Sequence, residues 1–213
     1  MRDTLFTGVD IGSTKIAVVV GQLDRERHLH IQAATQEPTQ GIRRGGITDI
    51  DEVANGITRA LDRAAHLTGA RSMRAFCSIS GAHIQSQNHR GAVAIAPSNR
   101  DIDGDDITHV LDVAGSVPLE ANRMVLAVLP RTYLVDGQDG IKNPAGMAGY
   151  RLEAEAHIVT GAHSAYRNLL KCAERARLEV EDVVVAPLAA AEAVLAPGER
   201  DGATALIDLG GGT

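Results

Sequence analysis

Short apolar runs separated by glycine and polar residues dominate the start of the chain. Two of them, at residues 4–11 and 15–23, stand on either side of a Gly-Ser-Thr turn, and a third covers residues 28–35. Aliphatic runs of this length, bounded by turn-forming residues, are typical of strands in a buried sheet. The pattern therefore predicts a hairpin with a third strand after it.

The spacing of apolar residues then lengthens from two to three or four, which predicts a helix over residues 49–68. Thr48 or Asp49 can cap its first turn, and Gly69 is suited to end it. The apolar stripe of this helix consists of Ile50, Val53, Ile57, Leu61, Ala64 and Leu67. A strand at residues 75–80 follows. This order of elements resembles the ribonuclease H-like half of the actin fold.

Residues 83–162 break with this order and predict a small α+β insert. Residues 150–160 alternate apolar and charged side chains, which predicts a strand that is packed on one face only. Its apolar face would carry Leu152, Ala154, Ala156 and Ile158, and its polar face Arg151, Glu153, Glu155 and His157. The other expected elements are a strand at 91–96, a helix opened by Asp103, Asp105 and Asp106, strands at 124–129 and 132–135 around Pro130, and a turn at 136–140.

Two acidic groups in the insert resemble functional sites but have a simpler interpretation. Residues 101–106 lack the spacing and the final glutamate of a Ca²⁺-binding EF-hand loop, so we interpret them as the start of a helix. Glu153 and Glu155 fall on the solvent face of an alternating strand. A charged exterior therefore fits them better than a catalytic pair.

After Gly161 the first pattern resumes. A helix is expected at 164–177, a strand at 180–186, and an alanine-rich helix at 187–195 that has a proline in its first turn. Residues 203–208 form a last apolar run, which predicts a final strand that leads into the last residues of the chain.

The candidate chemistry lies at two Asp-x-Gly turns, each at the end of a predicted strand. The first is Asp10-Ile11-Gly12-Ser13-Thr14-Lys15, and the second is Asp208-Leu209-Gly210-Gly211-Gly212-Thr213. Backbone N–H groups of such turns suit phosphate oxygens, and a carboxylate beside them can hold hydrated Mg²⁺. The pair resembles the phosphate-1 and phosphate-2 loops of the actin, Hsp70 and sugar-kinase superfamily. The neighbouring arginines in the loop at 41–46 fit surface solvation better than phosphate binding.

Composition narrows the class of protein. A net charge of −6 and the absence of tryptophan in 213 residues argue against nucleic acid as a partner. We find no apolar stretch that would span a membrane and no signal peptide at the N-terminus. Cys77 and Cys172 lie far apart in sequence, which predicts two buried, reduced thiols.

Three stretches, at residues 8–15, 136–161 and 187–195, make the chain similar to the FtsA family of actin-like bacterial cell-division proteins. The middle stretch, which contains Asp-Gly-Gln-Asp-Gly-Ile-Lys-Asn-Pro-Ala-Gly-Met, is characteristic of that family. The similarity covers the whole chain. It implies an α/β fold in which residues 1–82 and 163–213 form the phosphate-binding actin-fold subdomain 1A, with an inserted SHS2-like subdomain 1C at residues 83–162.

The resemblance also implies ligands, partners and a location. ATP would be bound with Mg²⁺, which Asp10 and Asp208 would hold through water. An FtsA-type scaffold would form filaments, tether FtsZ and recruit later divisome proteins at the cytoplasmic face of the membrane, at the division site. The adenosine motif, the FtsZ-binding surface and the membrane helix of the family lie beyond the second loop, so the chain is expected to be an N-terminal part. The expected phosphate contacts are Gly12, Ser13, Thr14, Lys15, Gly210, Gly211, Gly212 and Thr213.

The sequence assigns no catalytic residue. Many relatives place a glutamate before the proline that matches Pro187, whereas this chain has Ala186, which cannot accept a proton or orient water. We therefore expect at most a weak ATPase. Two alternatives stay open: an FtsA-like pilus-assembly scaffold of the PilM type, and a sugar-kinase-like phosphotransferase. The segment around Asp136 favours FtsA over the first, and the second needs an acceptor pocket that the sequence does not indicate.

Overall fold

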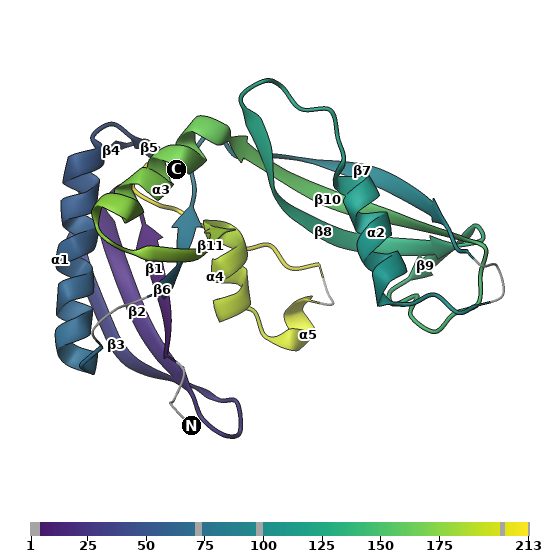
Figure 1. Ribbon diagram of the computed structural model, residues 1–213, viewed down its shortest axis with the longest axis horizontal. Coiled ribbons are helices and arrows are strands. Elements are labelled where there is room, and N and C mark those ends of the chain that lie inside the picture. Colours follow the sequence, from purple (N-terminus) through teal and green to yellow (C-terminus); the bar gives the residue numbers. More distant parts are fainter. Residues whose placement is uncertain (1–4, 71–73, 97–99, 201–202, 213) are drawn as a thin grey trace. The chain divides into compact units, whose positions relative to one another are not determined.

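The chain forms two compact units, each of which combines helices with a sheet (Figure 1). The computed structural model describes residues 5–70, 74–96, 100–200 and 203–212. Unit 1 comprises residues 1–83 and 164–213, and unit 2 comprises residues 84–163. The mixed α/β class that the sequence predicts is confirmed.

Unit 1 is built on a five-stranded sheet in the order β11-β6-β1-β2-β3. The first three strands form the predicted antiparallel meander, β6 pairs parallel to β1, and β11 pairs parallel to β6. The bounds are β1 Leu5–Ile11, β2 Lys15–Leu23, β3 Leu29–Pro38, β6 Arg74–Ile79 and β11 Glu179–Val185, and a small second sheet joins β4 Ile42–Arg43 to β5 Gly46–Ile47.

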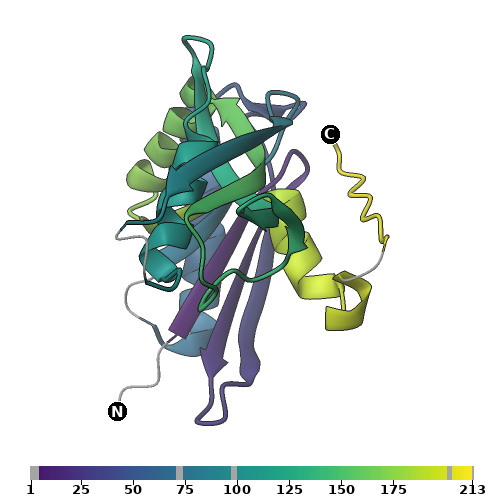
Figure 2. The same cartoon turned by 90° about the vertical axis from the view of Figure 1, so that its right-hand side faces the viewer.

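Helices pack on both faces of this sheet. Helices α1 (Ile50–Thr68) and α3 (His163–Arg175) lie on one face, and α4 (Ala186–Val194) lies on the other (Figure 2). A short α5 (Pro197–Arg200) follows. Of the two predicted caps, Thr48 and Asp49, it is Asp49 that caps α1, because its side chain accepts hydrogen bonds from the backbone N–H groups of Asp51 and Glu52. The core under α1 includes Val9, Ile16, Val18, Val53 and Ile57, all at most 2% exposed.

Residues 203–212 depart from the sequence-based expectation. The run 203–208, which the sequence predicts to be a strand, forms neither strand nor helix (Figure 2). Its Ile207 is 77% exposed, and the following Leu209 is 88% exposed. A strand needs a neighbour to satisfy its backbone hydrogen bonds, and no described strand pairs with this run. The predicted strand is therefore wrong.

Unit 2 is an antiparallel sheet with one helix on one of its faces. The strand order is β7-β10-β8-β9. Leu152, Ala154, Ala156 and Ile158 are all fully buried, while Glu155 on the opposite face forms ion pairs with Arg90 and Arg131. The predicted alternation, with a charged exterior at Glu153 and Glu155, is confirmed. The bounds are β7 Gln85–Ala94, α2 Gly104–Gly115, β8 Arg123–Val135, β9 Gln138–Ile141 and β10 Arg151–Ala162.

Two strands of unit 2 are longer than the sequence pattern indicates. Strand β7 begins six residues before the predicted residue 91, in a polar stretch with no apolar alternation. Strand β8 continues through Pro130, where the sequence predicts a break between two strands. The register with β10 shifts between Glu155 and Ala156, next to that proline. Such an irregularity lets a strand accommodate a residue that has no N–H to donate.

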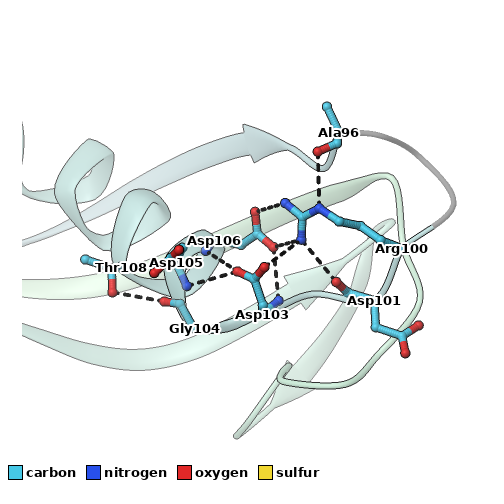
Figure 3. A network of polar contacts seen from close by, with 8 residues as sticks. All are labelled: Ala96, Arg100, Asp101, Asp103, Gly104, Asp105, Asp106 and Thr108. Atoms are coloured by element: carbon cyan, nitrogen blue, oxygen red, sulfur yellow. Dashed lines mark hydrogen bonds and ion pairs between the residues drawn. The ribbon is translucent and has the colours of Figure 1, made fainter.

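Acidic residues at the start of α2 belong to a capping network that Arg100 completes (Figure 3). Asp103 is the N-cap, and its side chain accepts hydrogen bonds from the backbone N–H groups of Asp105 and Asp106. The Arg100 guanidinium donates to both oxygens of the Asp106 carboxylate, at 2.6 and 2.7 Å. This contact lowers the pKa of Asp106 to about 2. The interpretation of residues 101–106 as a helix start is confirmed.

Candidate functional site

The tip of the β1–β2 hairpin forms the first of the two predicted loops. The Gly12 backbone N–H donates to the Lys15 carbonyl at 3.0 Å, which closes a tight turn over Ser13 and Thr14. Thr14 and Lys15 are exposed, and Ser13 is half-buried. Hydroxyl groups and an ammonium group therefore stand at an accessible hairpin tip, and these are groups that bind phosphate oxygens.

Asp10, just before this turn, is held by the neighbouring strand. The Ser78 hydroxyl of β6 donates to the Asp10 carboxylate at 2.5 Å and accepts a hydrogen bond from the Ile11 backbone N–H at 3.1 Å. One hydroxyl thus fixes the orientation of the carboxylate. Sequence reasoning missed Ser78. The available signal was a polar residue on the outward face of an otherwise apolar strand.

The second glycine-rich loop lies against the first. A side chain added at Gly211 would collide with Thr14, and one added at Gly212 would collide with the Ser13 hydroxyl. The Cβ of such a side chain at Gly212 would also lie 2.9 Å from the Arg44 Cα atom. Glycine is therefore required for this approach. The structure brings two loops together from opposite ends of the sequence.

Gly210 is exposed, and Thr213 lies outside the described residues. The described contact between the loops is the one at Gly211 and Gly212.

The turn between β4 and β5 adds a third segment to the same place. The Gly45 backbone N–H donates to the Ser13 hydroxyl at 3.0 Å, so this turn is tied to the hairpin tip. Arg43 and Arg44 are exposed, as the sequence analysis expects of solvated side chains. Their turn nevertheless lies beside both loops, with the Arg44 Cα atom and the Gly45 nitrogen next to Gly212. Sequence spacing alone could not show this proximity.

Asp10 and Asp208 line one cavity of about 510 Å³ on the outer face of the unit 1 sheet. Ser78 lines it too, and the rest of the lining is largely apolar, including Phe76 and the alanines of α4. The two carboxylates that the sequence singles out are thus brought to the same space. A pair of carboxylates fits Mg²⁺, which keeps several waters and shares phosphate oxygens.

No three His, Cys, Asp or Glu side chains gather as a self-sufficient metal site within the described part of the chain. An ion at this place would therefore depend on water and on the oxygens of a phosphate ligand for most of its coordination. That is the usual mode in which Mg²⁺ binds with nucleotides.

Besides Asp10, Ser78 and Asp208, the described lining of the cavity is mainly apolar. Ala186 begins α4 and lines the cavity, and its methyl side chain cannot accept a proton or orient water. Cys77 lies below the same surface, and burial raises the pKa of its thiol to about 11. A thiol with this pKa is protonated at neutral pH and a poor nucleophile. Both cysteines are free and buried, so the predicted state of the thiols is confirmed.

The fold defines the class: an actin-fold unit whose fourth main strand leads into an inserted α+β domain. A solved structure of the PilM-PilN type IV pilus biogenesis complex matches with a TM-score of 0.60 and 13% identity, covering 88% of this chain and 49% of that chain. This likeness shows the fold alone. The family model of the SHS2 domain inserted in FtsA matches residues 81–160.

The relatives then identify the family. The chain is 38% identical over 209 residues to the cell division protein FtsA of Pseudomonas aeruginosa, with 98% of this chain and 50% of that protein covered. It is 35% identical over 212 residues to FtsA of Bacillus subtilis, with 100% of this chain and 48% of that protein covered. The chain belongs to the FtsA family of cell-division proteins, and it spans about half the length of the curated relatives it matches.

None of the helices in the described ranges is both long and apolar enough to cross a membrane.

Proposed function

We propose that this chain supplies the phosphate-binding part of an FtsA-type scaffold in bacterial cell division, with ATP and Mg²⁺ as its ligands. One observation carries the proposal: Gly211 and Gly212 lie against the hairpin tip, next to the cavity that Asp10 and Asp208 line. The names of the similar proteins supply the process, which is cell division.

Each group at the site has a proposed role. Gly12, Ser13, Thr14 and Lys15 contact the β- and γ-phosphates from one side, and the loop at 210–213 closes on them from the other. Asp10 and Asp208 orient the waters around Mg²⁺, which supplies charge neutralisation when it is bound with the nucleotide. Ser78 keeps the Asp10 carboxylate in place through its hydrogen bond.

The nucleotide acts as a structural cue in this proposal. Ala186 cannot orient an attacking water, so turnover is at most slow. A nucleotide that binds between the two loops contacts segments that lie far apart in the sequence. Its binding therefore depends on how these two segments are positioned relative to each other. A ligand that favours one arrangement of those segments shifts the protein toward it.

The scaffold role requires partners that the whole protein would bind. FtsZ and later divisome proteins, self-association into filaments, and a position at the inner face of the membrane at the division site are all part of this proposal. Unit 2, none of whose described residues lines the cavity at the proposed phosphate site, is the proposed surface for protein partners.

Titration with Mg-ATP and Mg-tripolyphosphate tests the phosphate site in the chain as it stands. We expect both ligands to bind with similar dissociation constants, on the order of 1 mM or weaker, because the predicted contacts are to phosphates only. Asp10→Asn should weaken both at least about fivefold, since it removes a charge that acts on Mg²⁺. Isothermal calorimetry or amide chemical shifts in NMR would measure this.

The matched control is Asp62→Asn, which removes one exposed carboxylate from the middle of α1. Its binding should equal that of the unmodified chain. Micromolar ATP binding, or an Asp10→Asn variant that binds like the Asp62→Asn control, would contradict the proposed site.

The cell-division role has its own test in the organism that carries the gene. A fluorescent fusion of the complete gene product should gather at the division site, and the Asp10→Asn variant should gather there more weakly. A uniformly diffuse signal from the unmodified fusion would contradict the role in division.

A further inference from the structure

The turn that joins β4 to β5 contacts both candidate phosphate loops. Its Gly45 backbone N–H donates to the Ser13 hydroxyl of the hairpin tip at 3.0 Å. A Cβ at Gly212 of the second loop would lie 2.9 Å from the Arg44 Cα atom and 3.0 Å from the Gly45 nitrogen. The backbone of Arg44 and Gly45 is therefore packed against the first loop and the second.

Arg44 has a backbone conformation that arginine rarely adopts. Strands β4 and β5 pair with Arg43 opposite Gly46, so the two residues between them form the turn. Both have a positive φ, 49° for Arg44 and 73° for Gly45. Turns of this type favour asparagine followed by glycine, because asparagine tolerates a positive φ better than most other side chains do. The geometry of the turn therefore gives no reason for an arginine at this position.

The Arg44 side chain is available to a ligand. It is exposed, and its guanidinium forms no hydrogen bond or ion pair with another residue in the ranges that the structure describes. A guanidinium is planar and has five N–H donors, so it matches the oxygens of a phosphate group. The sequence alone favours surface solvation for this arginine, and its proximity to both loops is what changes the interpretation.

The charges on the two loops point in the same direction. The loops carry two carboxylates, Asp10 and Asp208, and one positive side chain, Lys15. A polyphosphate carries several negative charges at neutral pH, and bound Mg²⁺ offsets only part of them. The two loops by themselves therefore lack positive charge for such a ligand. A guanidinium beside them would supply it through charge-assisted hydrogen bonds.

We propose that the β4–β5 turn is a third segment of the phosphate site, in which the Arg44 guanidinium binds phosphate oxygens of a polyphosphate held by the two loops. The hydrogen bond from Gly45 to Ser13 keeps the turn in place beside the hairpin tip. The loops position the ligand, and Arg44 adds the positive charge that they lack. This inference rests on the proposed function, because it needs a polyphosphate at the two loops.

Arg27 provides a matched control in the same unit. It too has a positive φ, 66°, and is exposed, in the turn between β2 and β3. That turn lies at the opposite end of β2 from the hairpin tip (Figure 1). The nine residues of β2 span about 25 Å, whereas charges at the surface are screened over about 8 Å at physiological salt. Arg27→Asn therefore removes the same charge from the same kind of backbone, far from the site.

Calorimetric titration of the chain with Mg-tripolyphosphate compares the substitutions. Arg44→Asn should weaken binding at least about fivefold, because a charge-assisted hydrogen bond to phosphate is lost. Its melting temperature should stay the same or rise, since asparagine suits the turn better. Arg44→Lys should bind more tightly than Arg44→Asn, because it keeps the positive charge. Arg27→Asn should bind like the unmodified chain.

Arginine side-chain signals in NMR give a direct measurement of the contact. During the titration the Nε–H signal of Arg44 should shift until the site is saturated, because the guanidinium gains a phosphate partner. The Nε–H signal of Arg27 should not move.

Three outcomes would overturn the inference: equal binding by the Arg44→Asn and Arg27→Asn variants, binding by Arg44→Lys as weak as that by Arg44→Asn, or an unmoved Arg44 signal at saturation. The Asp10→Asn variant separates this inference from the proposed function. If Asp10→Asn weakens the ligand and Arg44→Asn does not, only the role of Arg44 is contradicted. If the unmodified chain does not bind Mg-tripolyphosphate, the proposed function fails and this inference fails with it.

Discussion

Ser78 and Ala186 set what the proposed phosphate site can do at the scale of single residues. The Ser78 hydroxyl holds the Asp10 carboxylate at 2.5 Å, while Ala186 contributes only a methyl group to the cavity lining. The hydrogen bond between Ser78 and Asp10 forms because β6 and β1 are neighbouring strands. The methyl group in the lining is there because α4 begins with alanine. The proposal of a phosphate-binding site with slow turnover at most rests on these two residues.

Arg100 gives a prediction at the same scale. Arg100→Gln should lower the free energy of unfolding by about 1–2 kcal/mol at pH 7, because the buried Asp106 carboxylate loses its charged partner. The folded-state pKa of Asp106, about 2, lies below its ordinary value of 3.8. The contribution is thus fully present above about pH 4 and is lost as the pH falls through 2.

Chemical denaturation of both proteins between pH 7 and pH 2 would measure this effect. Arg74→Gln is the control, since Arg74 pairs with Glu179 and Glu181 at an exposed position and should contribute less than about 0.5 kcal/mol. An Arg100→Gln difference that stays constant down to pH 2 would refute the assignment to Asp106.

At the scale of elements, local chemistry predicted helices better than strand ends. Asp49 caps the start of α1, and Gly69 follows its last residue. Both ends of this helix are therefore set by residues next to it in the sequence. The polar first half of β7 carries no such signal, since its partner β10 lies more than 50 residues away. The run at 203–208 shows the converse, because it is apolar and still finds no strand partner.

The cap of α1 can be tested directly. Asp49→Ala should destabilise unit 1 by about 1 kcal/mol, because two backbone N–H groups lose their acceptor. Thermal or denaturant unfolding followed by circular dichroism would report it. Asp62→Ala, in the exposed middle of the same helix, should cost nothing or stabilise slightly, since alanine is the better helix former. Equal losses from both substitutions would argue against the cap.

For the whole molecule, the two ends of unit 2 lie on neighbouring strands, which bears on whether the unit can be removed. Gln85 at its start pairs with Thr160 near its end, so the chain leaves and returns across one pair of neighbouring strands, about 5 Å apart. An inserted domain with adjacent ends can be removed without stretching its host. The proposed phosphate contacts all lie outside residues 84–160.

Replacing residues 84–160 by a short Gly/Ser linker should therefore leave tripolyphosphate binding within about twofold of the parent chain. In the complete gene product it should abolish filament formation or partner recruitment. Calorimetry and light scattering would follow the two properties. Loss of phosphate binding by a variant with a folded unit 1 would overturn this division of labour.

The sequence by itself determined the features that depend on near neighbours. These are the helix caps, the alternation of residues 150–160, the two glycine-rich loops and the family resemblance, which the relatives confirm. The roles of the loop residues stay predictions. The tertiary structure decided what depends on contacts between distant segments: the hydrogen bond from Ser78 to Asp10, the approach of Gly212 to Ser13, and the lack of a partner for residues 203–208. The physical reason is that backbone geometry and capping act over a few residues, whereas strand pairing and close approach need a surface that the folded chain provides.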